Sequence, residues 1–197
     1  MTAPTLEFWF DFASPYAYLS SQRLSGVQGV EVRYRPMLLG PVFQLLHGTM
    51  EPPALRNPAR WAWMQQDLPR QAKKYGVPFG LPSNFPRGSL LGTRVAMLGE
   101  DEPWVGAFVR GLFRASFGDD ADISTEAAVH AVLAPLTPRA SQLLALSGAP
   151  ETKERLKARA QVAVERGIFG APTFFADGAL YWGDDRLDDA LSSLAAR

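Results

Sequence analysis

Residues 11–17 place a serine and a proline directly after an apolar segment. Ser14 is a favoured helix N-cap residue, and Pro15 suits the first helical position. A helix N-terminus offers unpaired N–H groups and a partial positive charge, so it favours a bound anion. Thiols at such positions have pKa values of roughly 3.5–7.5 instead of about 8.5, and a cap hydroxyl can add a hydrogen bond to the thiolate. Ser14 is therefore the first candidate for chemistry; the alternative is an ordinary helix cap.

The sequence itself supplies no thiol for such a site. Cysteine is absent from all 197 residues, which excludes disulfides, thiolate metal sites and a cysteine nucleophile. His47 and His130, the two histidines, lie far apart in the sequence, so we expect no histidine-built metal site. No Gly-x-Ser-x-Gly segment favours a serine-hydrolase triad. Thiol chemistry would need a thiol that arrives on a ligand, and glutathione is the obvious candidate.

Charge and hydropathy narrow the choice of partners. Twenty basic residues balance twenty acidic ones, so the chain lacks the electropositive surface that binds nucleic acid, and we expect no nucleic-acid partner. No apolar run approaches the roughly 20 residues of a membrane span, and residues 1–4 show no signal-peptide pattern. We therefore expect a cytoplasmic protein without membrane contact.

The pattern around Ser14 predicts a strand–helix–strand unit. Residues 5–12 alternate as a strand should, residues 14–24 follow as a helix, and residues 30–37 read as a second strand. The connection is long enough for the two strands to be parallel.

The middle of the chain, from about residue 41 to residue 167, shows recurring helix signals and no convincing strand. Asn57 is a helix cap followed by apolar residues at helical spacing, and we expect Pro69 to bend or interrupt that helix. Ser124 is expected to cap a further helix. Residues 150–166 are strongly helical.

Strands return near the C-terminus. Residues 172–176 and 179–182 flank Asp177-Gly178, a strong two-residue hairpin signal. Residues 186–195 form a last amphipathic helix.

Three motifs resemble a known family. Residues 12–16 (FASPY), 167–172 (GIFGAP) and 183–186 (GDDR) resemble motifs of the DsbA-like branch of thioredoxin folds. Within that branch the match is to the 2-hydroxychromene-2-carboxylate isomerases and the kappa-class glutathione transferases. Ser14 occupies the position of the first cysteine of a Cys-x-x-Cys pair, which predicts that the chain has no disulfide oxidoreductase activity.

The resemblance implies an α/β fold of the thioredoxin-like, DsbA-like type with a large all-helical insertion. Residues 1–40 plus 151–197 would form the thioredoxin-like domain, and residues 41–150 the helical insertion. The family commonly forms dimers, so a homodimer is possible.

The resemblance also implies how glutathione would be held. Ser14 would contact the glutathione sulfur, while Ala171 and a cis-proline at Pro172 would pair with its cysteinyl part. Asp184 and Asp185 would hold the γ-glutamyl end, although an acidic pair ahead of a helix is equally explained by the helix dipole.

Two positions depart from the family pattern. A lysine of the family in a Pro-x-Lys setting is replaced by Arg60, which could still hold a carboxylate. The family's Gly-Asn-x-Pro-Pro loop corresponds to residues 48–53, which contain no asparagine and one extra residue.

These implications favour a glutathione-dependent cis-trans isomerase of 2-hydroxychromene-2-carboxylate or a similar aromatic-catabolism intermediate, with an aromatic carboxylate as substrate. One alternative is a kappa-like glutathione transferase or peroxidase. Another is a non-enzymatic thioredoxin-fold module that binds peptides or proteins.

Overall fold

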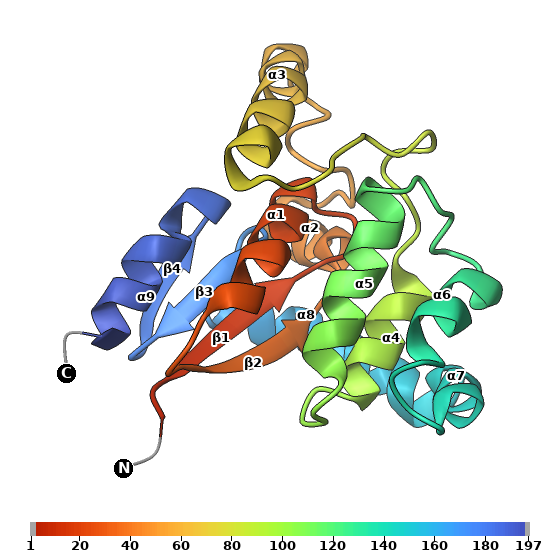
Figure 1. Cartoon of the computed structure of the whole chain (residues 1–197). Helices are drawn as coiled ribbons and strands as arrows, with labels where there is room; N and C mark the ends of the chain where they lie inside the picture. Colours follow the sequence, from red (N-terminus) through yellow and green to blue (C-terminus); the bar gives the residue numbers. More distant parts are fainter. Residues whose placement is uncertain (1–2, 196–197) are drawn as a thin grey trace.

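A four-stranded mixed sheet lies at the centre of the structure (Figure 1). The computed structural model describes residues 3–195. The strands are β1 (Thr5–Phe10), β2 (Glu31–Pro36), β3 (Thr173–Ala176) and β4 (Ala179–Trp182), in the order β2-β1-β3-β4. β1 pairs parallel with β2 and antiparallel with β3, and β3 pairs antiparallel with β4. The predicted parallel pair and the C-terminal hairpin are both confirmed.

Helices make up most of the remaining chain. They are α1 (Pro15–Arg23), α2 (Leu39–His47), α3 (Pro58–Tyr75), α4 (Leu90–Leu98), α5 (Val105–Phe117), α6 (Glu126–Leu133), α7 (Ala140–Ser147), α8 (Pro150–Glu165) and α9 (Leu187–Ala195), with short 3-10 turns η1 (Leu24–Gly26) and η2 (Asp184–Arg186). No helix within residues 3–195 is both long and apolar enough to cross a membrane.

Side-chain alternation along the central strands gives the sheet two apolar faces. Phe8, Phe10 and Phe174 belong to the core that contains buried residues of α1 and α9. Trp9 and Phe175 point the other way, into a second core shared with α2 and α8. Helices therefore cover both faces of the sheet, which is the predicted thioredoxin-like architecture.

The helices between α2 and α8 share the larger core. Phe12, two residues after β1, packs against Phe113 of α5 with ring centroids 4.8 Å apart. Gly92 of α4 allows a close approach, because a Cβ there would lie 2.3 Å from a methyl group of Leu112. α3 projects above this body in Figure 1. The division into residues 1–40 plus 151–197 and residues 41–150 stays a prediction.

The structure departs from two local predictions. Pro69 does not interrupt its helix, since α3 is continuous from Pro58 to Tyr75, whereas a bend at Pro69 stays a prediction. Pro69 and the preceding Gln65 are exposed, so water can reach the carbonyl that the proline leaves unpaired. The cap of α6 is Thr125, whose hydroxyl accepts a hydrogen bond from Ala128 N, and not Ser124.

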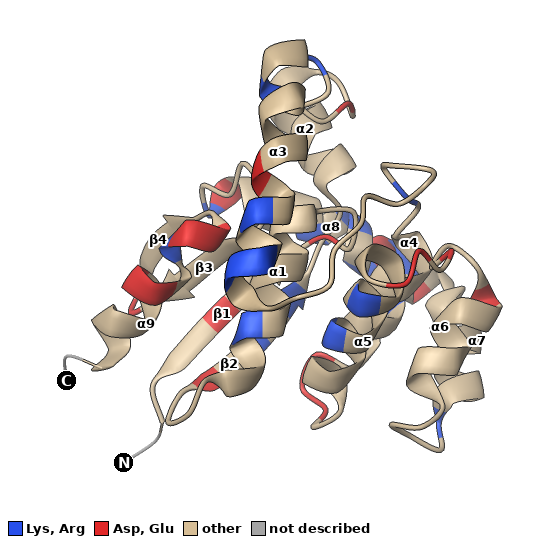
Figure 2. Cartoon of the chain, turned by 45° about the horizontal axis from the view of Figure 1, so that its top comes forward, with Lys and Arg blue, Asp and Glu red and all other residues tan. Residues whose placement is uncertain are grey.

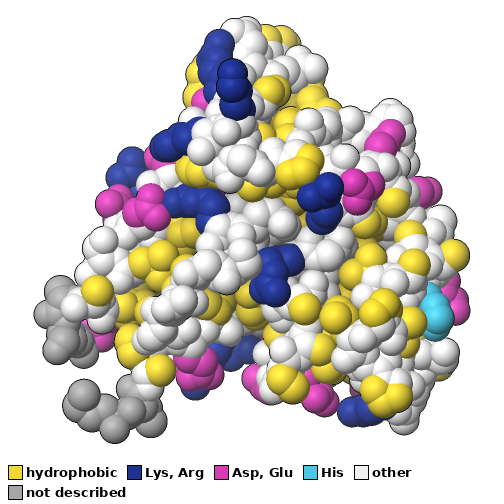
Figure 3. Space-filling model, in the orientation of Figure 1, with side chains coloured by type: hydrophobic (Ala, Val, Ile, Leu, Met, Phe, Trp, Pro, Cys, Tyr) yellow, Lys and Arg dark blue, Asp and Glu magenta, His cyan; other side chains and the backbone are white. Residues whose placement is uncertain are grey.

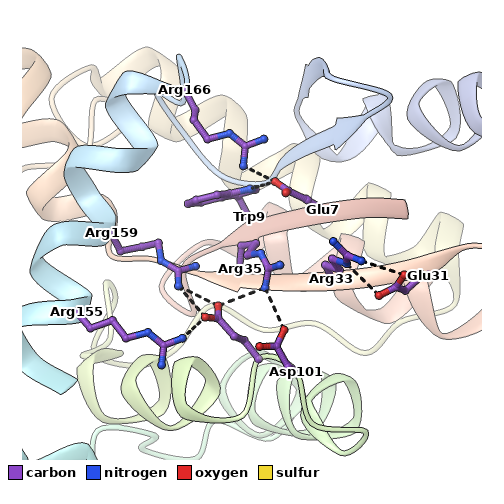
Figure 4. A network of polar contacts seen from close by, with 10 residues as sticks. Glu7, Trp9, Glu31, Arg33, Arg35, Asp101, Arg155, Arg159 and Arg166 are labelled. Atoms are coloured by element: carbon purple, nitrogen blue, oxygen red, sulfur yellow. Dashed lines mark hydrogen bonds and ion pairs between the residues drawn. The ribbon is translucent and has the colours of Figure 1, made fainter. Parts of the chain in front are cut away.

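A network of ion pairs fastens α8 to the turn between α4 and α5 (Figure 4). Glu100, in that turn, accepts hydrogen bonds of 2.9 Å from Arg159 to both carboxylate oxygens and also bonds Arg155. Arg35 of β2 lies 3.5 Å from the same carboxylate. The glutamate side chain is only 9% exposed, so one largely buried carboxylate in this turn joins α8 and β2. Because these arginines are paired, we interpret the network as structural.

Candidate active site

Ser14 connects the N-terminus of α1 with the loop before β3. Its hydroxyl oxygen accepts a hydrogen bond of 3.2 Å from Ala17 N, so Ser14 caps α1 as predicted. The same hydroxyl donates to the carbonyl of Ala171 over 3.0 Å. The Ala171–Pro172 peptide bond is cis, also as predicted. The structure therefore brings together Ser14, Ala171 and Pro172, which lie far apart in the sequence.

Backbone donors beside Ser14 have no partner within residues 3–195. The Tyr16 N–H, in the first turn of α1, forms no hydrogen bond there, and neither does the Ala171 N–H. Ala171 is half-buried and precedes the cis bond, beside the Ser14 hydroxyl. Free N–H groups at a helix start and next to a cis-proline fit a thiol-bearing peptide such as glutathione: the first favours a thiolate and the second can pair with a peptide carbonyl.

Asp11 supports the loop that carries Ser14. Its carboxylate accepts hydrogen bonds from Ala13 N (2.9 Å), Leu39 N (2.8 Å) and the Ser89 hydroxyl (2.7 Å). Burial raises the pKa of the Asp11 carboxyl, and these three hydrogen bonds oppose the shift. The loop is thereby tied to the starts of α2 and α4.

Tyr16 joins the start of α1 to α3, which lies directly above it (Figure 1). The phenol donates a hydrogen bond of 2.8 Å to Asp67 of α3. Burial and this carboxylate raise the pKa of Tyr16, whereas the nearby Arg60 guanidinium opposes the rise. Tyr16 therefore stays neutral. Arg60 lies exposed on the first turn of α3, near enough to Tyr16 to affect the pKa of the phenol. In the space-filling view, hydrophobic surface lies beneath α3 (Figure 3).

The two predicted carboxylates of η2 have different surroundings. Asp184 is 4% exposed and accepts hydrogen bonds from the Ser20 hydroxyl (2.8 Å) and Arg23 (3.3 Å) of α1. Burial raises the pKa of Asp184, and these contacts oppose the rise. Arg23 also bonds Asp188 at the start of α9, a helix whose acidic residues are drawn red in Figure 2. Asp184 is thus engaged in joining η2 to α1.

Asp185 is the exposed member of the pair. Its carboxylate folds over Gly183, where a Cβ would lie 2.5 Å from Asp185 Oδ1 and where φ is +113°. Gly183 N in turn donates to the Pro172 carbonyl over 3.0 Å. Asp185 therefore lies next to the cis-proline loop, with one oxygen 3.0 Å from Arg186. Of the two aspartates, Asp185 is the one that a ligand can reach.

Asp11 and the Tyr16–Asp67 pair were missed in the sequence analysis. The signal for Asp11 was a carboxylate at the end of an apolar strand, immediately before the cap. Tyr16 was visible in residues 12–16, but its partner is distant in the sequence. Within residues 3–195 no group of three or more histidine or acidic side chains is placed to hold a metal ion.

Comparisons with known proteins agree with this geometry. The DSBA-like thioredoxin domain matches residues 5–195. A 2-hydroxychromene-2-carboxylate isomerase of Sphingobium xenophagum is 31% identical over 188 residues, covering 93% of this chain and 94% of the relative. A glutathione S-transferase kappa 2 of Caenorhabditis elegans is 26% identical, covering 96% and 91%. A solved 2-hydroxychromene-2-carboxylate isomerase structure superposes with a TM-score of 0.87 at 28% identity, covering 98% of this chain and 95% of that one.

The chain therefore belongs to the DSBA-like thioredoxin family, in the group that contains the 2-hydroxychromene-2-carboxylate isomerases. The resemblance inferred from the three short motifs is confirmed.

Proposed function

We propose that the protein is a glutathione-dependent cis-trans isomerase acting on 2-hydroxychromene-2-carboxylate or a similar aromatic carboxylate. The main support is the position of the Ser14 hydroxyl, which lies at the N-terminus of α1 and contacts the residue before the cis-proline bond Ala171–Pro172. The chain has no cysteine of its own, so the thiol must come from a ligand. The relatives named isomerases, similar over nearly the whole chain, support the same reaction.

In this proposal the protein binds and orients a thiol. Bound glutathione would supply a thiolate nucleophile able to add to an unsaturated acid. The addition would turn a double bond into a single bond that can rotate, and loss of the thiolate would restore the double bond in the isomer. The Ser14 hydroxyl, which donates to Ala171 O in this structure, turns its hydrogen toward the sulfur. The Tyr16 N–H at the positive end of α1 adds a second donor. Both favour the thiolate over the thiol.

Other residues hold the ends of the tripeptide. The Ala171 N–H pairs with the cysteinyl carbonyl, since it has no partner among the described residues. Asp185, exposed beside Gly183, receives the γ-glutamyl ammonium. Arg60 pairs with a carboxylate of glutathione or of the substrate. Asp184 acts indirectly, by fixing η2 against α1.

The proposed setting follows from the same chemistry. An enzyme that depends on reduced glutathione needs a compartment that supplies it, so the proposed location is the cytoplasm. The proposed assembly is a homodimer.

Turnover measured with and without reduced glutathione tests this function. Ser14→Ala should slow glutathione-dependent isomerisation roughly ten- to hundredfold, because one hydrogen bond to a charged group, worth about 1.5–3 kcal/mol, is lost. Ser25→Ala is the matched control: its exposed hydroxyl bonds only the Gln22 carbonyl within the described part of the chain. Isomerisation that needs no glutathione, or equal rates in both variants, would contradict the proposal.

A kappa-like glutathione transferase or peroxidase is the second candidate, favoured by the similarity to the nematode kappa protein. The same Ser14 site would then serve another electrophile. Glutathione conjugation or hydroperoxide reduction that exceeds isomerisation by wild-type protein would favour this candidate.

A further inference from the structure

A small pocket lies at the start of α4, beside the loop that leads into α6. It has a volume of about 170 Å³ and is lined by Gly88, Leu90, Leu91, Arg94 and Ser124. Leu90 is 44% exposed, so an apolar side chain stands at the mouth of the pocket. None of these five residues was among the predicted site residues.

Arg94 is the unusual member of this lining. It is half-buried, and its Nε is enclosed without a hydrogen-bond partner. None of residues 3–195 forms an ion pair or a side-chain hydrogen bond with its guanidinium. Other arginines with restricted exposure, such as Arg35 and Arg159, are paired with Glu100. A buried N–H donor is normally paired, so the enclosed Nε–H of Arg94 is a free donor that an anion held by this guanidinium would satisfy.

The other residues of the pocket indicate which chemical groups the bound anion should have besides its negative charge. Ser124 donates its hydroxyl hydrogen to Asp122 over 2.7 Å, so this hydrogen is not free for a ligand. The free donors of the pocket are those of the Arg94 guanidinium. The Asp122 carboxylate is exposed and accepts from the Ser124 N–H as well, which leaves it weakly repulsive toward a ligand held by Arg94. Leu90 and Leu91 offer apolar contact and no hydrogen bond. A cavity of roughly 150 Å³ is known to accept benzene.

We propose that this pocket binds the carboxylate of a small, one-ring aromatic acid, with Arg94 holding the carboxylate and the two leucines contacting the ring.

The pocket is connected to the Ser14 loop by a short chain of side-chain contacts. Ser89, one residue before α4, donates to Asp11 over 2.7 Å, and Asp11 supports the loop that carries Ser14. A Cβ at Gly92 would lie 3.5 Å from the ring of Phe12. A ligand at the first turn of α4 therefore sits two contacts away from the α1 N-terminus.

Titration of ¹⁵N-labelled protein with sodium benzoate, followed by NMR, tests the proposal without glutathione or turnover. We expect benzoate to shift the amide resonances of residues 88–94 and 124, and benzamide, the neutral isostere, to bind at least about tenfold more weakly. Arg94→Met should weaken benzoate at least about tenfold, and Arg94→Lys, which keeps the charge but not the planar fork, should weaken it less.

Two variants serve as controls. Arg33→Met removes an exposed guanidinium of β2 and should leave the benzoate affinity unchanged. Ser124→Ala should also leave it unchanged, because the Ser124 hydroxyl serves Asp122. Benzoate affinity that survives Arg94→Met, equal binding of benzamide, or shifts confined to other residues would overturn the proposal. Since no turnover is measured, failure here leaves the proposed isomerase intact, and the reverse also holds.

Discussion

Replacing Glu100 by glutamine tests the ion-pair network of Figure 4. The carboxylate is 9% exposed and pairs with Arg159 at 2.9 Å, with Arg35 at 3.5 Å and with Arg155. Glu100→Gln keeps the shape but removes the charge. Arg35 and Arg159 are then left mostly buried, with side-chain exposures of 18% and 13%.

The expected cost is large because buried cations lose their partner. Breaking a buried pair by removing one member costs about 3–5 kcal/mol. Arg155 is 46% exposed and Arg35 keeps a 3.9 Å contact with Asp101, so the lower end, about 3 kcal/mol, is expected. For a chain of this length that lowers Tm by roughly 6–12 °C.

Glu102→Gln is the matched control. Its ion pair with Arg139 is exposed on both sides (42% and 53%), so the expected cost is about 0–1 kcal/mol. Calorimetry of the two variants and the wild type decides the matter. If Glu100→Gln lowers Tm no more than Glu102→Gln, the buried network adds no net stability and the reasoning fails.

Three further substitutions have expected outcomes. Burial raises the pKa of Asp11 above its ordinary 3.8, so the folded state holds this proton more tightly than the unfolded chain. The stability of the wild type relative to Asp11→Asn should therefore fall as pH rises above about 4, measured by urea unfolding across pH; a flat difference would contradict the shift. Tyr16→Phe removes the bond to Asp67 and should cost about 1 kcal/mol, measured by Tm; no loss would show that the bond is not needed. Pro69→Ala restores a helical N–H at an exposed position of α3 and should raise Tm; a lower Tm would show that proline is preferred there.

Local sequence patterns predicted correctly those parts of the fold that depend on neighbouring residues. The strand alternation of residues 5–10, the cap at Ser14 and the hairpin at Asp177-Gly178 follow from neighbouring residues, and all three are present. The hairpin residues have positive φ, 51° and 80°, as this turn requires. The cis bond at Pro172 came from the resemblance, since local sequence does not distinguish it from trans.

The sequence-based predictions failed where contacts between residues distant in the sequence determine the local structure. Pro69 sits on the exposed side of α3, and the buried Leu68 and Ala72 keep the helix intact across it. The contrast between buried Asp184 and exposed Asp185 depends on Ser20, which lies more than 160 positions away. Side-chain partners so distant in the sequence leave no local pattern.

The titration of glutathione bound to this protein tests the central claim most directly. With protein in excess, the ultraviolet absorbance of the thiolate is followed against pH for wild type and Ser14→Ala. We expect the thiol of bound glutathione to have a pKa at or below about 7.5, compared with about 8.5 for a free thiol, and we expect Ser14→Ala to move that pKa back toward the free value. Absence of binding, or a bound thiol that titrates as the free one does, would contradict the proposed role of Ser14 in glutathione chemistry.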